Sequence, residues 1–217
     1  MRRFRKAFSL VELIIVIVVI GILATMTTQR LKRDEKSEAK NKILTMIRYS
    51  RSLALHDDKQ LRDKPKWQQG FWSFRVYKCR NENKYYIMIA SNENKDDHIT
   101  KEETAVDPSN GKNLYAYNDC KTAKKDSQVS PNVFLDNFGI NRVQFLGCSG
   151  VGSNSKYIGF DKFGRVYRNF NSSNTPDYRT YRTSDCKIKF SFETGGNFQV
   201  RVDRETGFAY IEGEPNL

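Results

Sequence analysis

The chain has 217 residues, a formal net charge of +12, four cysteines and two histidines. Neither His56 nor His98 stands at a ligand spacing from a cysteine, and the sequence holds no Cys-x-x-Cys pair, which argues against a zinc site. Residues 63–217 suffice for one domain with its own core.

Residues 8–26 form an apolar stretch after a basic leader, residues 1–7. As a helix these 19 residues would extend about 28 Å, close to the roughly 30 Å hydrocarbon core of a membrane. Placing a charged carboxylate at the centre of a membrane helix costs roughly 2.5 to 3.5 kcal/mol of insertion free energy. Each Leu, Ile or Val between positions 13 and 23 contributes about 0.3 to 0.6 kcal/mol in favour of insertion, so together these residues can offset the cost of Glu12. The stretch therefore predicts a transmembrane helix in which Glu12 still needs a counter-ion.

A cut between Ala7 and Phe8 would supply that counter-ion. It would create an α-amino group four residues from Glu12. The unperturbed pKa of such an amine is about 7.7 to 8, so it is cationic at neutral pH. The amine of one chain could then pair with Glu12 of another, which would link processing to subunit assembly.

This N-terminal pattern resembles the class III signal of type IV pilins and type II secretion pseudopilins, through the sequence Lys6-Ala7-Phe8-Ser9-Leu10-Val11-Glu12 and the apolar run after it. The resemblance implies that a prepilin peptidase cuts after Ala7, that Phe8 becomes N-methylated, and that Glu12 is the assembly glutamate. It further implies a single-pass protein of the bacterial inner membrane with its C-terminal domain in the periplasm. Its partners would be other pilin or pseudopilin subunits, the peptidase and an inner-membrane assembly platform.

The alternatives are a removed secretory signal peptide and a plain membrane anchor, since both begin with a basic region and an apolar run. A glutamate inside the apolar stretch is unusual in a signal peptide. No clear small-x-small cleavage site follows the stretch either. Both features favour the pilin-type leader.

The four cysteines are spread through the C-terminal part of the chain. In an oxidising compartment they predict two disulfides, whereas the alternative is four small buried apolar side chains. Three pairings are open. We favour the pairing in which each bond closes a loop inside one run of strands, Cys79 with Cys120 and Cys148 with Cys186.

Residues 27–62 predict a continuation of the helix into water, with one apolar stripe made by Ala39, Ile43, Met46, Ile47, Ser50 and Ala54. Beyond Pro65 the periodicity changes to two, which predicts strands at 71–77, 84–90, 142–146, 156–160, 166–170, 187–192, 198–202 and 208–211. Residues 92–130 predict a long polar loop with a short strand at 114–117. The expected fold is α+β: a long N-terminal helix packed on an antiparallel β-rich domain, residues 63–217. Residues 157–167 and 198–211 also look like H-type minor pseudopilins.

Catalysis finds little support, and the sequence predicts neither an enzyme nor a cofactor. Residues 147–151 imitate a nucleophile elbow, but Val151 stands where Gly is required. Residues 107–111 resemble a calcium-binding loop in composition but lack the spacing of acidic ligands that such a loop needs, so they favour a plain turn.

A basic, aromatic-rich region lies near the C-terminus and could bind DNA phosphates and stack on bases. The alternative is a solvated face combined with core aromatics. The candidates for DNA contact are Arg165, Arg168, Arg179 and Arg182, interleaved with Tyr167, Phe170, Tyr178 and Tyr181.

The sequence therefore predicts a minor pseudopilin, a structural subunit of a type II secretion or type IV pilus-like filament. The alternative is a DNA-binding minor pilin of a DNA-uptake machine. An anchored exported enzyme is the weakest class, because no catalytic constellation was found.

Overall fold

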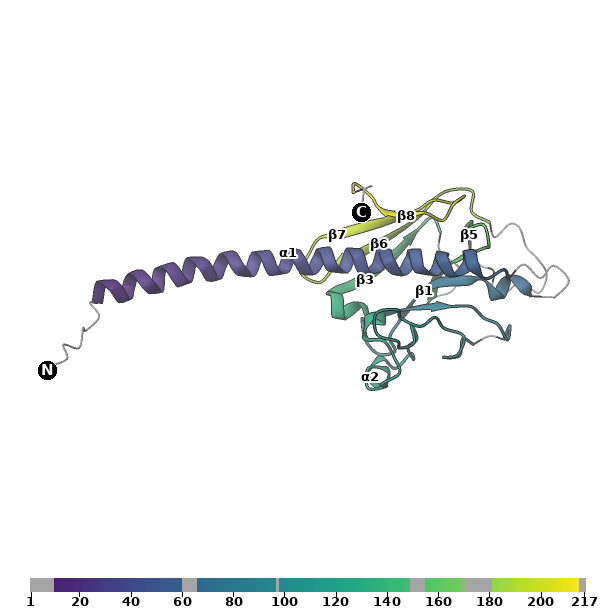
Figure 1. Cartoon of the computed structure of the whole chain (residues 1–217), viewed down its shortest axis with the longest axis horizontal. Coiled ribbons are helices and arrows are strands. Elements are labelled where there is room, and N and C mark those ends of the chain that lie inside the picture. The colour runs from purple at the N-terminus through teal and green to yellow at the C-terminus, as the bar shows by residue number, and fades with distance from the viewer. Residues whose placement is uncertain are drawn as a thin grey trace. The chain divides into compact units, whose positions relative to one another are not determined.

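The structure is a computed structural model that describes residues 10–59, 66–96, 98–148, 155–168, 170 and 181–214. The chain divides into two compact units, Met1–Glu38 and Ala39–Leu217. The helix α1, Leu10–His56, contributes residues to both (Figure 1). The expected α+β class is confirmed, because this N-terminal helix is followed by antiparallel sheets.

In the first unit, residues 10–38 are helical throughout. The large apolar side chains of residues 10–23 are all exposed. Among the helices in the described part of the chain, none is long and apolar enough to cross a membrane.

In the second unit, residues 39–56 of α1 pack one face into the core. The six residues of the expected apolar stripe are all buried, which confirms the periodicity: Ala39, Ile43, Met46, Ile47, Ser50 and Ala54. The helix ends at His56 and not at the expected Arg62. The Nδ1 atom of His56 lies 2.7 Å from the Ser52 carbonyl oxygen, where the last turn leaves carbonyl groups without intrahelical partners.

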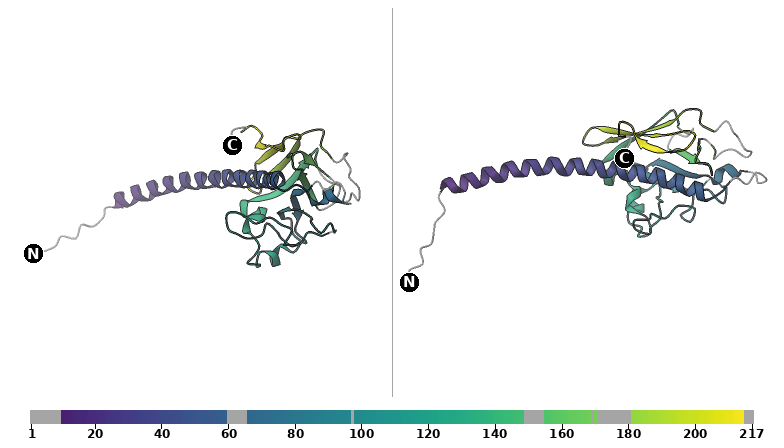
Figure 2. Two further views of the ribbon diagram at one scale, coloured as in Figure 1. Left: turned by 45° about the vertical axis from the view of Figure 1, so that its right-hand side comes forward. Right: turned by 45° about the horizontal axis from the view of Figure 1, so that its top comes forward.

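Two four-stranded sheets make up the rest of the core. The first has the order β2-β1-β4-β5, with bounds β1 Trp72–Lys78, β2 Tyr85–Ala90, β4 Ser155–Phe160 and β5 Val166–Tyr167. The second has the order β3-β6-β7-β8, with bounds β3 Ile140–Leu146, β6 Cys186–Phe192, β7 Asn197–Val202 and β8 Ala209–Ile211. Neighbouring strands pair antiparallel in both. Figure 2 shows both sheets from two further directions.

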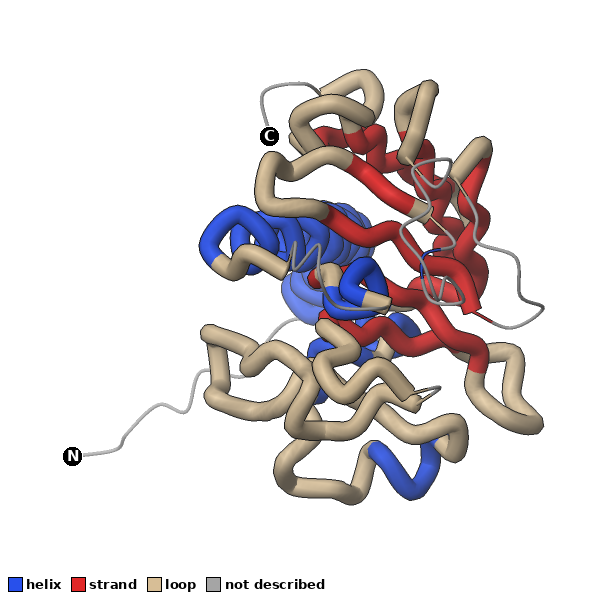
Figure 3. The backbone as a smooth tube through the Cα atoms, turned by 90° about the vertical axis from the view of Figure 1, so that its right-hand side faces the viewer, coloured by secondary structure: helices blue, strands red, loops and turns tan. Residues whose placement is uncertain are grey.

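Each expected strand has a counterpart, except the short one at 114–117. That segment makes separate backbone contacts, such as the hydrogen bond from Leu114 N to Ala105 O. The segment between β2 and β3 is mostly loop, as Figure 3 shows in tan. It also contains helical turns that the periodicity does not predict: α2 Cys120–Ala123 and the 3₁₀ turns Pro131–Val133 and Leu135–Phe138, with a further 3₁₀ turn, Trp67–Gly70, before β1.

Both disulfides have the pairing favoured from the sequence. Cys79 after β1 is bonded to Cys120 at the start of α2, and Cys148 after β3 is bonded to Cys186 at the start of β6. The first bond ties the polar loop to the first sheet. The second joins two neighbouring strands of the second sheet.

Candidate functional site

The apolar segment, residues 10–23 of α1, is the most unusual surface of the chain. Its twelve large apolar side chains are between 45% exposed, at Val16, and 74% exposed, at Leu10. A soluble monomer rarely exposes a contiguous apolar patch beyond a few hundred Å². Covering these half-exposed side chains would stabilise an assembly by on the order of 10 kcal/mol, at about 1.5 to 3 kcal/mol for each full burial.

Glu12 lies in the first turn of α1. The helix dipole favours a negative charge there, because the first backbone N–H groups point toward the N-terminus. The expected cleavage site, Ala7 and Phe8, lies outside the described residues. The pairing of a new amine with Glu12 therefore stays a prediction.

The four candidate DNA-binding arginines do not share one environment. Arg165 is held by Asp161, with its Nη2 atom 2.7 Å and its Nε atom 2.8 Å from Asp161 Oδ2. The guanidinium also lies over the Phe163 ring at 5.0 Å. Its charge is thus largely balanced within the chain.

Arg182 is only 7% exposed, and its Nη2 donates to Ser184 Oγ at 2.8 Å. Burial lowers the pKa of Arg182, and the nearby Arg168 lowers it further. Arg168 is half-buried, and Arg179 lies outside the described residues. Two of the four arginines are therefore poorly placed to meet DNA phosphates.

The aromatic residues proposed to stack on bases are mostly core residues. Tyr167 and Phe170 belong to a buried cluster that also contains Trp67, Phe71 and Tyr157. Tyr181 packs at the edge of this cluster, and Tyr178 lies outside the described residues. The structure thus favours core aromatics over a stacking surface.

The side chain of Asp107 in the polar loop is 2% exposed, and its carboxylate accepts several side-chain hydrogen bonds, a group that we call the carboxylate hub. Its oxygens accept hydrogen bonds from Ser109 Oγ at 2.6 Å, Ser130 Oγ at 2.7 Å and Asn132 Nδ2 at 2.7 Å. Burial alone would raise the pKa of Asp107, but these hydrogen bonds outweigh it and lower the pKa to about 2. Within the described residues, no group of three or more His, Cys, Asp or Glu side chains could hold a metal ion.

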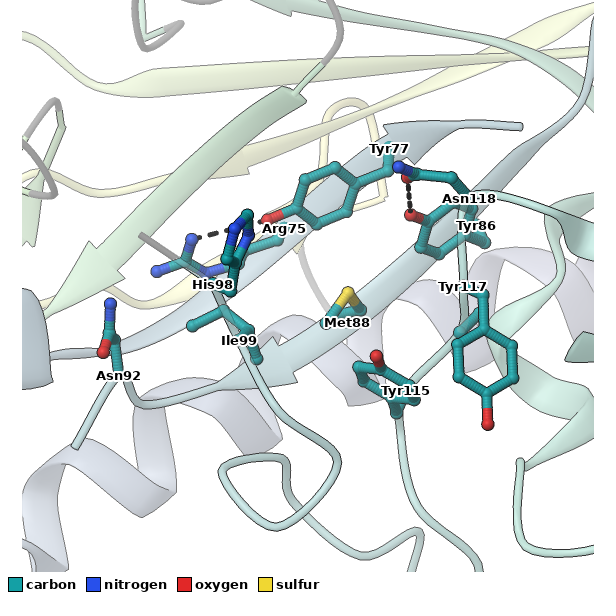
Figure 4. Close-up of a pocket in the computed structure, with 11 residues that line it drawn as sticks. Arg75, Tyr77, Tyr86, Met88, Asn92, His98, Ile99, Tyr115, Tyr117 and Asn118 are labelled. Atoms are coloured by element: carbon teal, nitrogen blue, oxygen red, sulfur yellow. Dashed lines mark hydrogen bonds between the residues drawn. The ribbon is translucent and has the colours of Figure 1, made fainter. Parts of the chain in front are cut away.

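A pocket of about 530 Å³, which the sequence did not predict, lies on the first sheet (Figure 4). Alternation along β1 places Arg75 and Tyr77 on one face, and their cross-strand partners Met88 and Tyr86 share it. The pocket is lined by Arg75, Tyr77, Tyr86, Met88, Asn92, His98, Ile99, Tyr115, Ala116, Tyr117 and Asn118. Its signal in the sequence is Arg75, a cation that stands between Phe74 and Val76 in β1.

Comparison with known proteins bears on the N-terminus. Residues 2–28 match the family model described as the prokaryotic N-terminal methylation motif. No curated protein and no solved structure matches the chain. The match covers the expected cleavage site, Glu12 and the apolar segment, whereas the H-type resemblance finds no support. The chain therefore carries the class III signal of the type IV pilin-like and pseudopilin proteins.

Proposed function

We propose that the protein is a minor pseudopilin, a non-catalytic subunit of a type II secretion or type IV pilus-like filament. The observation that carries the proposal is the methylation motif at residues 2–28, which runs directly into the exposed apolar segment. A motif for N-terminal processing followed by an uncovered apolar helix suits a subunit whose helix is covered by neighbouring subunits.

In this proposal the apolar segment anchors the chain in the bacterial inner membrane before assembly. The prepilin peptidase cuts between Ala7 and Phe8, and Phe8 is then methylated. The new amine pairs with Glu12 of a neighbouring subunit as an assembly platform adds the chain to the filament. The unit Ala39–Leu217 lies on the periplasmic side, where an oxidising environment suits its two disulfides.

The DNA-uptake alternative has weaker support from the described residues. Arg165 is paired with Asp161, and Arg182 is buried. DNA binding of this kind needs open cationic side chains that neutralise phosphates. Strong, salt-dependent retardation of DNA by the full-length protein, lost on reversing Arg165 and Arg168, would favour the alternative.

Glu12→Ala tests the proposed assembly step. We expect the variant to be processed and membrane-associated like the wild type, yet absent from filaments sheared from the cell, because the subunit amine has lost its partner. Glu38→Ala is the matched control, since it removes an exposed carboxylate from the same helix. Filaments that contain the Glu12→Ala chain at the wild-type level would contradict the assembly role.

A further inference from the structure

The pocket on the first sheet is lined by four tyrosines, Tyr77, Tyr86, Tyr115 and Tyr117, and we call it the tyrosine pocket. Tyr86 is only 2% exposed, whereas the other three are half-buried and present part of their surface to solvent. Tyr77 and Tyr86 are stacked with ring centroids 5.4 Å apart, and Tyr115 meets Tyr117 edge to face at 5.3 Å. A ligand in the pocket would therefore lie between a pair of rings on the sheet and a pair on the polar loop.

The sheet wall and the loop wall of this pocket are fixed to each other. Asn118 on the loop accepts hydrogen bonds from the sheet side, at its Oδ1 from the Tyr86 hydroxyl at 2.9 Å and at its carbonyl from Arg80 N at 2.7 Å. The disulfide between Cys79 and Cys120 joins the same two segments. The pocket is therefore formed before any ligand binds, and its volume of about 530 Å³ falls within the roughly 300 to 1,000 Å³ of small-ligand sites.

Two phenol groups offer open hydrogen-bond donors to a ligand. Within the described residues the Tyr115 hydroxyl has no hydrogen-bond partner, and in Figure 4 it points toward Met88 on the sheet wall. The Tyr77 hydroxyl accepts a hydrogen bond from Arg75 Nη1 at 3.5 Å, which leaves its own proton available. Both groups can therefore donate to a ligand oxygen.

The side-chain acceptors of the pocket, in contrast, are closed. Among the described residues that line it, none is acidic. Asn118 Oδ1 is engaged by Tyr86, and Asn92 Oδ1 is buried away from solvent. The tyrosine pocket therefore suits a ligand that brings apolar rings and hydrogen-bond acceptors but few donors.

We propose that the tyrosine pocket binds a proline-rich segment of another protein in the polyproline II conformation, with two backbone carbonyls accepting from the Tyr77 and Tyr115 hydroxyls and proline rings packed on the tyrosines. Such a segment has no internal hydrogen bonds, so its carbonyls are available. It is also ordered before binding, and aromatic-lined grooves use this property elsewhere. The five prolines of this chain stand apart from one another in the sequence, so a second copy of the chain does not supply the segment. The inference goes beyond the proposed function and does not depend on it.

A neutral sugar is the competing ligand, and the pocket favours it less. Its ring could also lie against tyrosines, but its hydroxyl groups are donors that need acceptors. The amide oxygens of Asn92 and Asn118 are closed to such donors.

A peptide bound as an added strand is disfavoured as well. That mode of binding needs an open sheet edge. The outer edge of β2 is already occupied, because Ala105 N donates to Ile89 O at 2.8 Å and Ser91 N donates to Glu103 O at 3.0 Å. A polyproline II segment does not need this edge, since it binds through rings and single carbonyls.

Calorimetric titration of the full-length protein in a mild detergent tests the proposal with decaproline blocked at both ends. A blocked Gly-Ser decapeptide has the carbonyls without the rings, and cellohexaose has rings that carry hydroxyl donors. We expect decaproline to bind at least tenfold more tightly than either of them. Equal binding of the Gly-Ser peptide, tighter binding of cellohexaose, or no binding of decaproline would overturn the proposal.

Tyr115→Phe removes one donor and keeps the ring. It should weaken decaproline binding about 2- to 10-fold, the contribution of one neutral hydrogen bond, and Tyr77→Phe should have a similar effect. Tyr85→Phe is the matched control, because Tyr85 is a half-buried tyrosine of the same sheet that does not line the pocket. Its affinity should stay within about twofold of wild type. Wild-type affinity in both folded pocket variants would refute the donor arrangement and with it the proposal.

The methionine methyl signals of the same protein locate the bound peptide. Met88 lines the tyrosine pocket, whereas Met46 is buried on α1 and does not line it. In NMR spectra of protein labelled with ¹³C at the methionine methyl groups, decaproline should shift the Met88 signal and leave the Met46 signal in place. Binding by calorimetry with an unchanged Met88 signal would place the peptide elsewhere and overturn the proposal.

Discussion

Asp107→Asn should destabilise the fold through the carboxylate hub of the polar loop. Three side-chain donors, from Ser109, Ser130 and Asn132, point at the Asp107 oxygens within 2.7 Å. The asparagine amide keeps one acceptor oxygen and places N–H donors against the remaining partners. Because an unsatisfied buried polar group costs about 1 to 3 kcal/mol, we expect a loss of about 3 kcal/mol in the free energy of unfolding at pH 7.

The dependence of this loss on pH can be worked out from the pKa of Asp107. The folded-state pKa is about 2, lower than its ordinary value of 3.8. A depressed carboxylate stabilises the fold above its unfolded pKa, and this contribution disappears as pH falls through the folded pKa. At about 1.36 kcal/mol per pKa unit, the contribution is about 2 kcal/mol.

Urea unfolding of the compact unit Ala39–Leu217, followed by the fluorescence of Trp67 and Trp72, measures the effect. The difference between wild type and Asp107→Asn should narrow by about 2 kcal/mol between pH 6 and pH 2, since only the wild type has this carboxylate to protonate. Glu102→Gln removes an exposed charge from the same loop and should change the unfolding free energy by less than about 0.5 kcal/mol. If the difference in unfolding free energy between wild type and Asp107→Asn stays constant or widens toward pH 2, the stabilising role of the Asp107 carboxylate would be refuted.

The other predictions concern covalent and backbone constraints in the same unit. Replacing the cysteines of either disulfide by serine should lower the free energy of unfolding by about 4 kcal/mol. The chain-entropy relation gives nearly the same value for both bonds, because they close loops of similar length, with sequence separations of 41 and 38 residues. Non-reducing peptide mapping that finds free thiols or crossed pairs in the exported protein would contradict the pairing. Gly207→Ala should lower the free energy of unfolding by more than about 2 kcal/mol, because φ is +65° and an added Cβ would collide with the Gly164 carbonyl. Gly195→Ala, at φ +84°, places its Cβ near no other atom and should lower the free energy of unfolding by about 1 kcal/mol. Equal thermal unfolding midpoints for the two alanine variants would contradict this contact.

The helices and strands that could be predicted are those in which the spacing of apolar residues along the sequence indicates which face is buried. The stripe from Ala39 to Ala54 repeats every three or four residues, so it identified the buried face of α1. The strands alternate with period two, and glycine turns such as the one at Gly207 separate them. These signals are local, which is why a single sequence contains them.

The parts that could not be predicted depend on contacts between distant segments. The strand expected at 114–117 is absent because its backbone instead bonds to scattered partners, among them Ala105. The pocket forms only where β1, β2 and the polar loop come together in the fold. Arg75 alone, as a residue in the sequence, does not predict that these segments are neighbours. Arg165 was a candidate for DNA contact, yet the turn after β4 places Asp161 beside its guanidinium.

The most direct test of the pilin-like assignment is the intact mass of the chain purified from cells with and without the prepilin peptidase. With the peptidase, we expect a chain that begins at Phe8 and carries one added methyl group. Without it, the chain should retain Met1 to Ala7 and be absent from filaments. A mature protein that begins at any other residue, or the same mass in both strains, would contradict the account.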